Sequence, residues 1–428
     1  MWMAATMLIA AASFADEVAM FRGGPEHLGV TSEQAPREFH RVKWKFPTGG
    51  RIFSSPVTAN GLIYFGSDDG NIYAVDATTG VQKWMAATGG PVDSTPAVVD
   101  GSLYVVSYDG RLYCLDAATG DTKWKFITEG ERRFEAKGIH GFQPRTQTFA
   151  DPYDMYQSSP TVVNGTVYFG SGDTNVYAVN AESGELKWKF KCGDVVHASP
   201  AVSGGVVFFG SWDSFFYAVD EATGALKWKF QGGEDPVIHN QIGFQSSPSV
   251  KDGIVYTGCR DSNVYALDVQ TGKEVWRSNN EGSWVNSTPA LLGDSVLYST
   301  CDSRVFRLVD AKTGKEKYRQ VGKGMMFSSP TIAGDVVVVG GNNGTVEARD
   351  LASGKSLWIF QTDGSKANPY WVLTSDNFLN VPMLSTSAFQ SAEAVNKLFT
   401  AGCVFSTPLV SKGVVYFGST DGYMYAVE

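Results

Sequence analysis

One position of a repeated phrase carries residue types that could bind a small ligand. The chain has 428 residues, and Ser-Ser-Pro or a close variant of it recurs along most of its length. The residues that directly precede these segments are, in order, Phe53, Asp93, Gln157, His197, Gln245, Asn286, Phe327 and Phe405. Amide, carboxylate and imidazole groups can orient a ligand, while phenylalanine packs against its apolar part. We therefore predict an amphipathic ligand pocket wherever the fold gathers these eight residues, which we call the funnel ring; a water-filled funnel is the alternative.

Two members of the funnel ring, Asp93 and His197, are of types that serve as a general acid and base. They belong to repeats two units apart, so direct contact is not expected, and we assign no catalytic residue. The Asp residues of the recurring S-x-D and Y-A-V-D phrases occupy turn positions, where Asp bonds to nearby backbone groups. We interpret both of these sets as turn residues and predict no metal site from them.

The elements that position the funnel ring follow from the repeat. A unit such as "SSPVTANGLIYFGSDDGNIYAVDATTGVQKW" (54–84) alternates β-branched and aromatic residues with turns rich in Gly and Asn. This pattern predicts four short strands per unit. Such a unit repeated around an axis predicts an all-β fold, a β-propeller of four-stranded antiparallel blades.

The count of units predicts eight blades. Seven units hold four strands, whereas the last one, 405–428, stops after three. Its missing strand is supplied by "RVKWKF" at 41–46, which matches "DTKWKF" and "ELKWKF" of other units. We predict that this N-terminal strand closes the ring and leaves no open blade edge. The fourth-strand Trp residues are interpreted as plugs between blades.

Composition limits the classes of function. The formal charge of −9 and the absence of a basic stripe argue against a nucleic-acid partner. Residues 2–15 form a short apolar run that ends in Ser-Phe-Ala, which predicts a signal peptide with cleavage after Ala15 and a periplasmic or secreted location. No later stretch predicts a transmembrane span, and no Cys follows the run to carry a lipid anchor. The five Cys residues are expected to be buried free thiols.

Three insertions interrupt the period of the repeat, at 125–156, 229–244 and 359–404. All three fall between a fourth strand and the next first strand, so we predict that they decorate one face of the disc, the usual kind of place for function. The first insertion has mixed charge and is expected to form a polar rim wall. The third predicts a helix near 388–399.

The third insertion also carries a cluster of apolar residues. It is interpreted either as a lid on its own propeller or as an exposed ledge that docks a partner protein. The residues expected to dock that partner are Tyr370, Trp371, Phe378 and Leu379.

The phrase A-x-D-x-x-T-G-x-x-x-W resembles the Trp-docking repeat of the PQQ-like propeller superfamily over about residues 40–428. The superfamily includes quinoprotein dehydrogenases, BamB-type outer-membrane assembly factors and other exported propellers. The leader at 16–39, with "FRGGPEHLGV" at 21–30, looks like that of the last group. This chain lacks the vicinal Cys pair typical of soluble dehydrogenases and the lipobox Cys typical of assembly factors.

We therefore favour a non-catalytic binding or scaffold module of the cell envelope over a PQQ- and calcium-dependent oxidoreductase acting on alcohols or sugars. An envelope protein or a small molecule would bind at the decorated face. The sequence assigns no cofactor to the chain.

Overall fold

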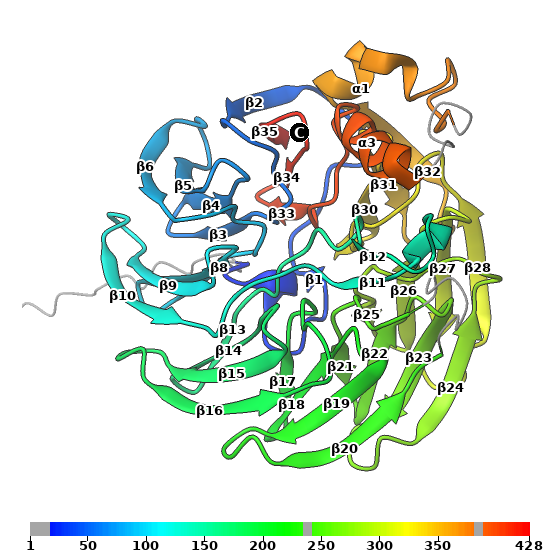
Figure 1. Cartoon of the computed structure of the whole chain (residues 1–428). Helices are drawn as coiled ribbons and strands as arrows, with labels where there is room; N and C mark the ends of the chain where they lie inside the picture. Colours follow the sequence, from blue (N-terminus) through cyan, green and yellow to red (C-terminus); the bar gives the residue numbers. More distant parts are fainter. Residues whose placement is uncertain (1–17, 234–241, 381–387) are drawn as a thin grey trace, which may run out of the picture.

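Each repeat forms the four strands that its pattern predicts. In the first unit Asn60 and Gly61 have φ angles of 53° and 75°, which the two central residues of a type I′ hairpin require. Eight antiparallel blades stand around a central channel (Figure 1), so the predicted eight-bladed propeller is confirmed. The structure is a computed structural model, and it describes residues 18–233, 242–380 and 388–428.

In every blade the first strand lies at the channel and the fourth strand lies at the rim (Figure 1). Blades one to four comprise β3 (Val57–Ala59), β4 (Leu62–Gly66), β5 (Asn71–Asp76) and β6 (Gln82–Ala87); β7 (Ala97–Val99), β8 (Ser102–Ser107), β9 (Arg111–Asp116) and β10 (Thr122–Ile127); β13 (Thr161–Val163), β14 (Thr166–Gly170), β15 (Asn175–Asn180) and β16 (Leu186–Lys191); β17 (Ala201–Ser203), β18 (Val206–Gly210), β19 (Phe215–Asp220) and β20 (Leu226–Gln231). Blades five to eight comprise β21 (Ser249–Lys251), β22 (Ile254–Gly258), β23 (Asn263–Asp268) and β24 (Glu274–Asn279); β25 (Ala290–Leu292), β26 (Ser295–Ser299), β27 (Val305–Asp310) and β28 (Glu316–Val321); β29 (Thr331–Ala333), β30 (Val336–Gly340), β31 (Thr345–Asp350) and β32 (Ser356–Gln361); β33 (Leu409–Ser411), β34 (Val414–Gly418), β35 (Tyr423–Val427) and β2 (Val42–Pro47).

The ring closes as the sequence predicts. Strand β2 pairs antiparallel with β35, with Trp44 opposite Ala426 and Lys45 opposite Tyr425. The last blade is therefore built from both ends of the propeller sequence, and its outer edge is complete.

Tryptophans dock each blade against the next. The Trp84 indole donates its N–H to the Ala117 carbonyl of the following blade at 3.0 Å, and the same bond recurs around the ring. Glycine in the T-G turn makes room for the indole, because a Cβ added to Gly80 would lie 2.7 Å from the Trp44 ring. Trp358 instead donates to Pro36, at 2.8 Å, where the leader takes the place of a turn that the eighth blade lacks. The interpretation of these residues as plugs is confirmed.

The leader lies inside the channel, which the sequence did not predict. From Val18 to Thr31 it passes the inner strands of successive blades, and six of these strands donate a backbone N–H to its carbonyl oxygens at 2.7–3.0 Å. It also adds β1 (Val30–Thr31) in parallel to β29 and forms the short 3₁₀ turn η1 (Phe21–Gly23). The leader thus pairs edge strands that would otherwise expose unpaired backbone groups to the channel.

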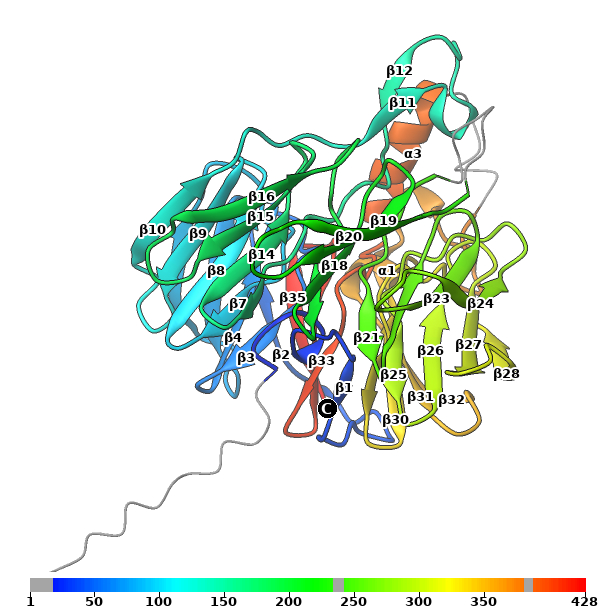
Figure 2. The same ribbon diagram turned by 90° about the horizontal axis from the view of Figure 1, so that it is seen from below.

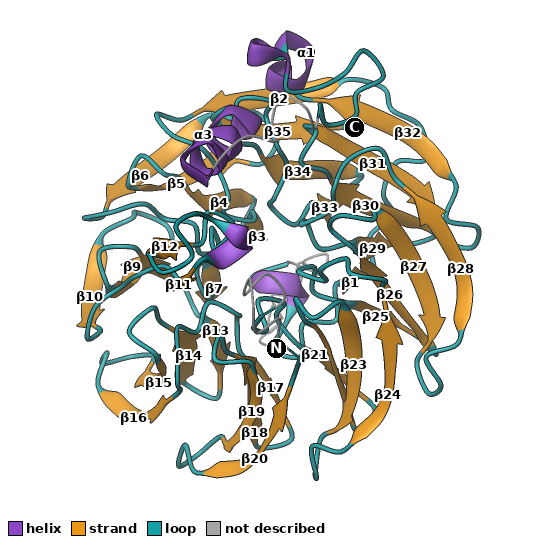
Figure 3. Cartoon of the chain, turned by 45° about the vertical axis from the view of Figure 1, so that its right-hand side comes forward, coloured by secondary structure: helices purple, strands orange, loops and turns teal. Residues whose placement is uncertain are grey.

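The first and third insertions decorate one face (Figure 2). The first contains β11 (Glu135–Lys137), β12 (Thr148–Ala150) and the 3₁₀ turn η2 (Ile139–Gly141); the third contains α1 (Asp363–Ala367), the 3₁₀ turn η3 (Pro369–Trp371) and α3 (Ala388–Phe399). Strands β11 and β12 rise with α3 on one side of the disc, whereas β1 and the C-terminus lie toward the other (Figure 2). The few helical segments belong to the leader and these insertions (Figure 3). The predicted helix is confirmed, while much of the second insertion, residues 234–241, lies outside the described residues.

In the part of the chain that the structure describes, no helix has the length and apolarity to cross a membrane. The five Cys side chains are free and buried, as expected.

Candidate functional site

The structure brings all eight residues of the funnel ring together around one cavity in the channel. Each lies four residues before an inner strand, at the end of the connection that leads to it, so the eightfold repeat places them at one level. Their side chains are only 2–6% exposed, and the cavity between them leaves about 40 Å³ of free space for water. The funnel ring thus surrounds a small chamber whose walls are almost entirely buried.

The decorated face supplies the roof of this chamber. Tyr156, at the end of the first insertion, reaches across the mouth and donates a hydrogen bond to the Phe405 carbonyl at 3.4 Å. Phe399 of α3 packs edge-on against Phe53 and Phe405, with ring centroids 5.4 and 5.6 Å apart. Tyr153 stacks on Phe327 at 6.0 Å. The first and third insertions therefore both cover the mouth.

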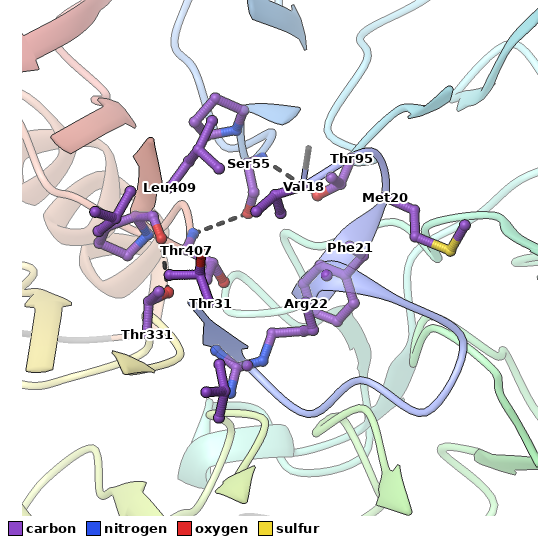
Figure 4. A pocket seen from close by; sticks show the side chains of 16 residues that line it. Val18, Met20, Phe21, Arg22, Thr31, Ser55, Thr95, Thr331, Thr407 and Leu409 are labelled. Carbon is purple, nitrogen blue, oxygen red and sulfur yellow. Dashed lines mark hydrogen bonds between the residues drawn. The ribbon is translucent and has the colours of Figure 1, made fainter. Parts of the chain in front are cut away.

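The leader supplies the floor. Phe21 lines both the chamber and a second, smaller cavity of about 30 Å³ beneath it (Figure 4). The buried Arg22 guanidinium donates to the carbonyls of Pro289, at 3.1 Å, and Pro330. His27 is fully buried against the Pro248 carbonyl and the Thr161 hydroxyl, at 3.0 and 3.1 Å. Burial lowers the pKa of His27 to about 3, so its imidazole is neutral.

His197 is held by the first insertion. Its Nδ1 lies 2.7 Å from Asp154 Oδ1 and its Nε2 lies 2.9 Å from Glu131 Oε1. Burial favours the neutral ring, but the two carboxylates outweigh it and raise the pKa of His197 to about 10. The ring is therefore an imidazolium at neutral pH with both N–H groups occupied, so it cannot act as a general base. The suggested acid–base pair with Asp93 is not formed.

Asp93 is paired with a second acid instead. Its carboxyl group shares a hydrogen bond with Asp68, and burial together with that neighbour raises the pKa of Asp93 well above its usual range. Burial also raises the pKa of Asp68. Arg51 and Arg133 oppose both shifts. Two neighbouring carboxyl groups in a buried site disfavour the ionisation of both.

A second buried charge cluster fastens the first insertion. Arg260 is fully buried, pairs with Asp151 and lies over the rings of Trp284 and Trp212, at 3.7 and 4.7 Å from their centroids. His140 Nε2 lies 2.9 Å from the same carboxylate. Burial raises the pKa of Asp151, but Arg260 and His140 outweigh it, and the pKa is lowered overall. The expectation of a polar rim wall is wrong at Asp151 and Asp154, which are fully buried anchors.

The four residues expected to dock a partner divide into two pairs. Tyr370 is 57% and Trp371 78% exposed, and we call these two the aromatic tip. Phe378 is half-buried under the Arg304 guanidinium at 5.1 Å. Leu379 is half-buried against the cluster that roofs the chamber. These two are therefore less exposed to a partner than the aromatic tip is.

The chamber does not fit a quinone cofactor. A water molecule needs about 10–15 Å³ of such free space, so 40 Å³ accommodates roughly three water-sized groups and not a fused tricyclic ring. Among the described residues no three His, Cys, Asp or Glu side chains are arranged to hold a metal ion. Around this chamber the described residues therefore offer neither the space for a fused tricyclic ring nor a cluster of ligands for calcium.

Sequence reasoning missed the partners of the funnel ring. Asp154 and Glu131 lie in an insertion outside the repeat, so periodicity could not align them with His197. The aromatic residues of the insertion were a usable signal, because Phe134 and Phe142 form a small core with Trp212. A loop with its own core buries some of its charges.

The closed ring of four-stranded blades, with the leader in its channel, defines an eight-bladed β-propeller. The family model described as outer membrane protein assembly factor BamB matches residues 30–140, 153–279 and 260–381. Because these matches cover well over half of the chain, the chain belongs to this family, and the resemblance to PQQ-like, BamB-type propellers is confirmed.

Individual relatives are consistent with this family assignment. The outer membrane protein assembly factor BamB of Burkholderia pseudomallei (strain K96243) is 36% identical over 110 residues, which span 25% of this chain and 28% of that protein. The crystal structure of BamB from Moraxella catarrhalis superimposes with a TM-score of 0.63 at 15% identity, covering 91% of this chain and 97% of the other. The quinohemoprotein alcohol dehydrogenase from Comamonas testosteroni gives a TM-score of 0.69 at 15% identity, covering 98% and 81%. At such identities the structural matches show the fold alone.

Proposed function

We propose that this chain is an exported, non-catalytic scaffold of the cell envelope that holds a protein of outer-membrane assembly on its decorated face. Membership of the assembly-factor family supports the class of partner. The apolar run at residues 2–15 supports export to the periplasm. The exposed aromatic tip is the observation that supports a docking site.

The aromatic tip is presented on a strained backbone. Tyr370 and Trp371 have φ angles of 64° and 56°, a conformation that is unfavourable for bulky residues and is concentrated at functional sites. Asn368 fixes this segment, since its side chain bonds the Leu373 carbonyl at 2.8 Å and the Leu373 N–H at 2.9 Å. Asn380 donates to the Trp371 carbonyl at 3.0 Å. The tip is therefore held in place while its rings stay in solvent.

Fixed, exposed aromatic residues are typical anchors of protein interfaces. Trp and Tyr dominate interface hot spots, where truncation of one costs about 2 kcal/mol or more, and a preorganised anchor loses little conformational entropy on binding. Segment α1 and the chain that follows it project beyond the rim near β2 and β32, shown in orange in Figure 1. This position leaves the tip accessible to a large partner.

The experiment is capture from an envelope extract with immobilised wild-type protein and with the double variant Tyr370→Ala/Trp371→Ala. Ile127→Ala is the matched control, because Ile127 is 68% exposed on an outer strand away from the tip. We expect mass spectrometry to identify an outer-membrane assembly protein that the wild type and the control retain and the double variant loses. Equal capture by all three proteins would contradict the docking site.

Two further measurements test the rest of the proposal. The N-terminus of the mature protein, read by sequencing, is expected to be Asp16. Incubation with PQQ and calcium followed by desalting is expected to leave no quinone absorbance. A retained chromophore that supports dye reduction by alcohols or sugars would overturn the non-catalytic assignment.

A further inference from the structure

Several polar atoms that face the chamber have no hydrogen-bond partner. Gln157 accepts the Asp93 N–H through Oε1 at 3.2 Å, so its Nε2 is left over. Gln245 donates from Nε2 to the Tyr153 carbonyl at 2.8 Å, and its Oε1 is left over. Asn286 has both amide atoms unpaired, and Asp93 has Oδ1 unpaired. Burying such groups without a partner costs about 1–3 kcal/mol each, which favours an occupant that pairs them.

The chamber sets the size and shape of that occupant. Its free space of about 40 Å³ corresponds to roughly three water-sized groups, which is a molecule of a few non-hydrogen atoms. The polar atoms come from blades two to six. The remaining arc is aromatic, with Phe405 in contact with Phe53 and Phe327 at 5.5 and 5.4 Å between ring centroids.

We propose that this chamber binds a small protonated primary amine. An ammonium group carries three N–H donors, and the chamber offers three unpaired oxygens, Asp93 Oδ1, Gln245 Oε1 and Asn286 Oδ1. The phenylalanine arc accepts the carbon end of the amine and adds a cation–π attraction. The N–H groups left on Gln157 and Asn286 donate to a hydroxyl oxygen on the amine or to one accompanying water.

The carboxyl groups of Asp93 and Asp68 favour a positively charged ligand. Asp93 faces Asp68, Arg51, Arg133 and Tyr108, and His197 completes the charged surroundings through its edge contact with Tyr108 at 6.5 Å. Burial and the neighbouring acid raise the pKa of Asp93 and so favour a proton on the pair. An ammonium ion at Asp93 Oδ1 favours ionisation of the pair, so binding releases a proton. The affinity of the amine therefore rises with pH as long as the amine itself stays protonated.

The test is a titration of the full-length protein with methylammonium and with ethanolamine, followed by NMR of the ¹³C-labelled ligands and by calorimetry. Ethylene glycol serves as the uncharged isostere of ethanolamine. We expect saturable binding of one amine per chain, at least tenfold weaker binding of ethylene glycol, and an affinity that increases from pH 6 to pH 8.

Variants locate the site. Asp93→Asn keeps the shape of the side chain and is expected to weaken amine binding at least tenfold, and Asn286→Leu, which removes both amide atoms, provides a second test should the first variant fail to fold. Asp100→Asn is the matched control, because Asp100 is exposed beyond the other end of the same inner strand. The proposal is overturned by amine binding that is unchanged in Asp93→Asn, by equal binding of ethylene glycol, or by a chamber that holds water alone in a crystal grown with methylammonium.

Discussion

Replacing His197 by Gln tests how the first insertion is attached to the propeller. The imidazolium lies between Asp154 and Glu131 at 2.7 and 2.9 Å, and all three side chains are at most 2% exposed. Removal of the cation leaves two buried carboxylates without their partner, which costs about 3–5 kcal/mol. The pKa of His197 rises from 6.5 to about 10. At about 1.4 kcal/mol per pKa unit, this rise sets a similar upper limit on the free energy by which the imidazolium stabilises the fold.

The pH dependence gives the sign of the effect. Because the folded pKa of His197 is raised, its stabilisation is fully present below pH 6.5 and is lost as the pH rises through about 10. The difference in unfolding free energy between wild type and His197→Gln is therefore expected to be largest near pH 6 and to shrink toward pH 10. Urea titrations at pH 6, 8 and 9.5 measure it, and limited proteolysis of residues 125–156 reports the local loosening.

The exposed His40 provides the control. His40→Gln is expected to change the unfolding free energy by less than about 0.5 kcal/mol at every pH. The assignment of a buried imidazolium would be refuted if His197→Gln changed the unfolding free energy as little as this control does, at every pH.

Three further substitutions test other parts of the structure. Arg260→Met is expected to destabilise the fold by about 3–5 kcal/mol, because Asp151 is left buried without its cation; adding Asp151→Asn should restore part of this in urea titrations, and no restoration would argue against the pair. Gly80→Ala is expected to cost more than Gly61→Ala, since both have positive φ but only Gly80 contacts an indole, the Trp44 ring; equal losses of thermal stability would contradict the docking of Trp44. Trp371→Ala is expected to leave stability within about 0.5 kcal/mol and to weaken partner binding at least tenfold in a binding assay, whereas a loss of stability would show that this residue belongs to the fold.

The propeller could be predicted because its information is periodic. Trp44 matches the other fourth-strand Trp residues in its own sequence context, so the closing strand was visible without any long-range contact. In the same way, the position directly before each Ser-Ser-Pro segment predicted that the eight residues of the funnel ring lie together in the channel. Residues that share a position in the repeat can therefore be placed in the fold from the sequence alone.

The parts outside the period could not be placed. Arg22 and Phe21 lie in a leader whose backbone pairs with inner strands far away in the chain, and no local pattern encodes such pairing. The charges of the first insertion looked like a solvent-exposed wall because burial of Asp154 depends on His197, a residue of another blade. The exposure of Trp371 and the burial of Leu379 are likewise decided by packing rather than by residue type.

Site-specific photo-crosslinking in living cells tests the scaffold claim most directly. A photoreactive residue at position 371 is expected to form an adduct with an outer-membrane assembly protein, while the same residue at position 127 forms none. No adduct at position 371, or the same adduct at both positions, would contradict the claim that the aromatic tip docks the partner.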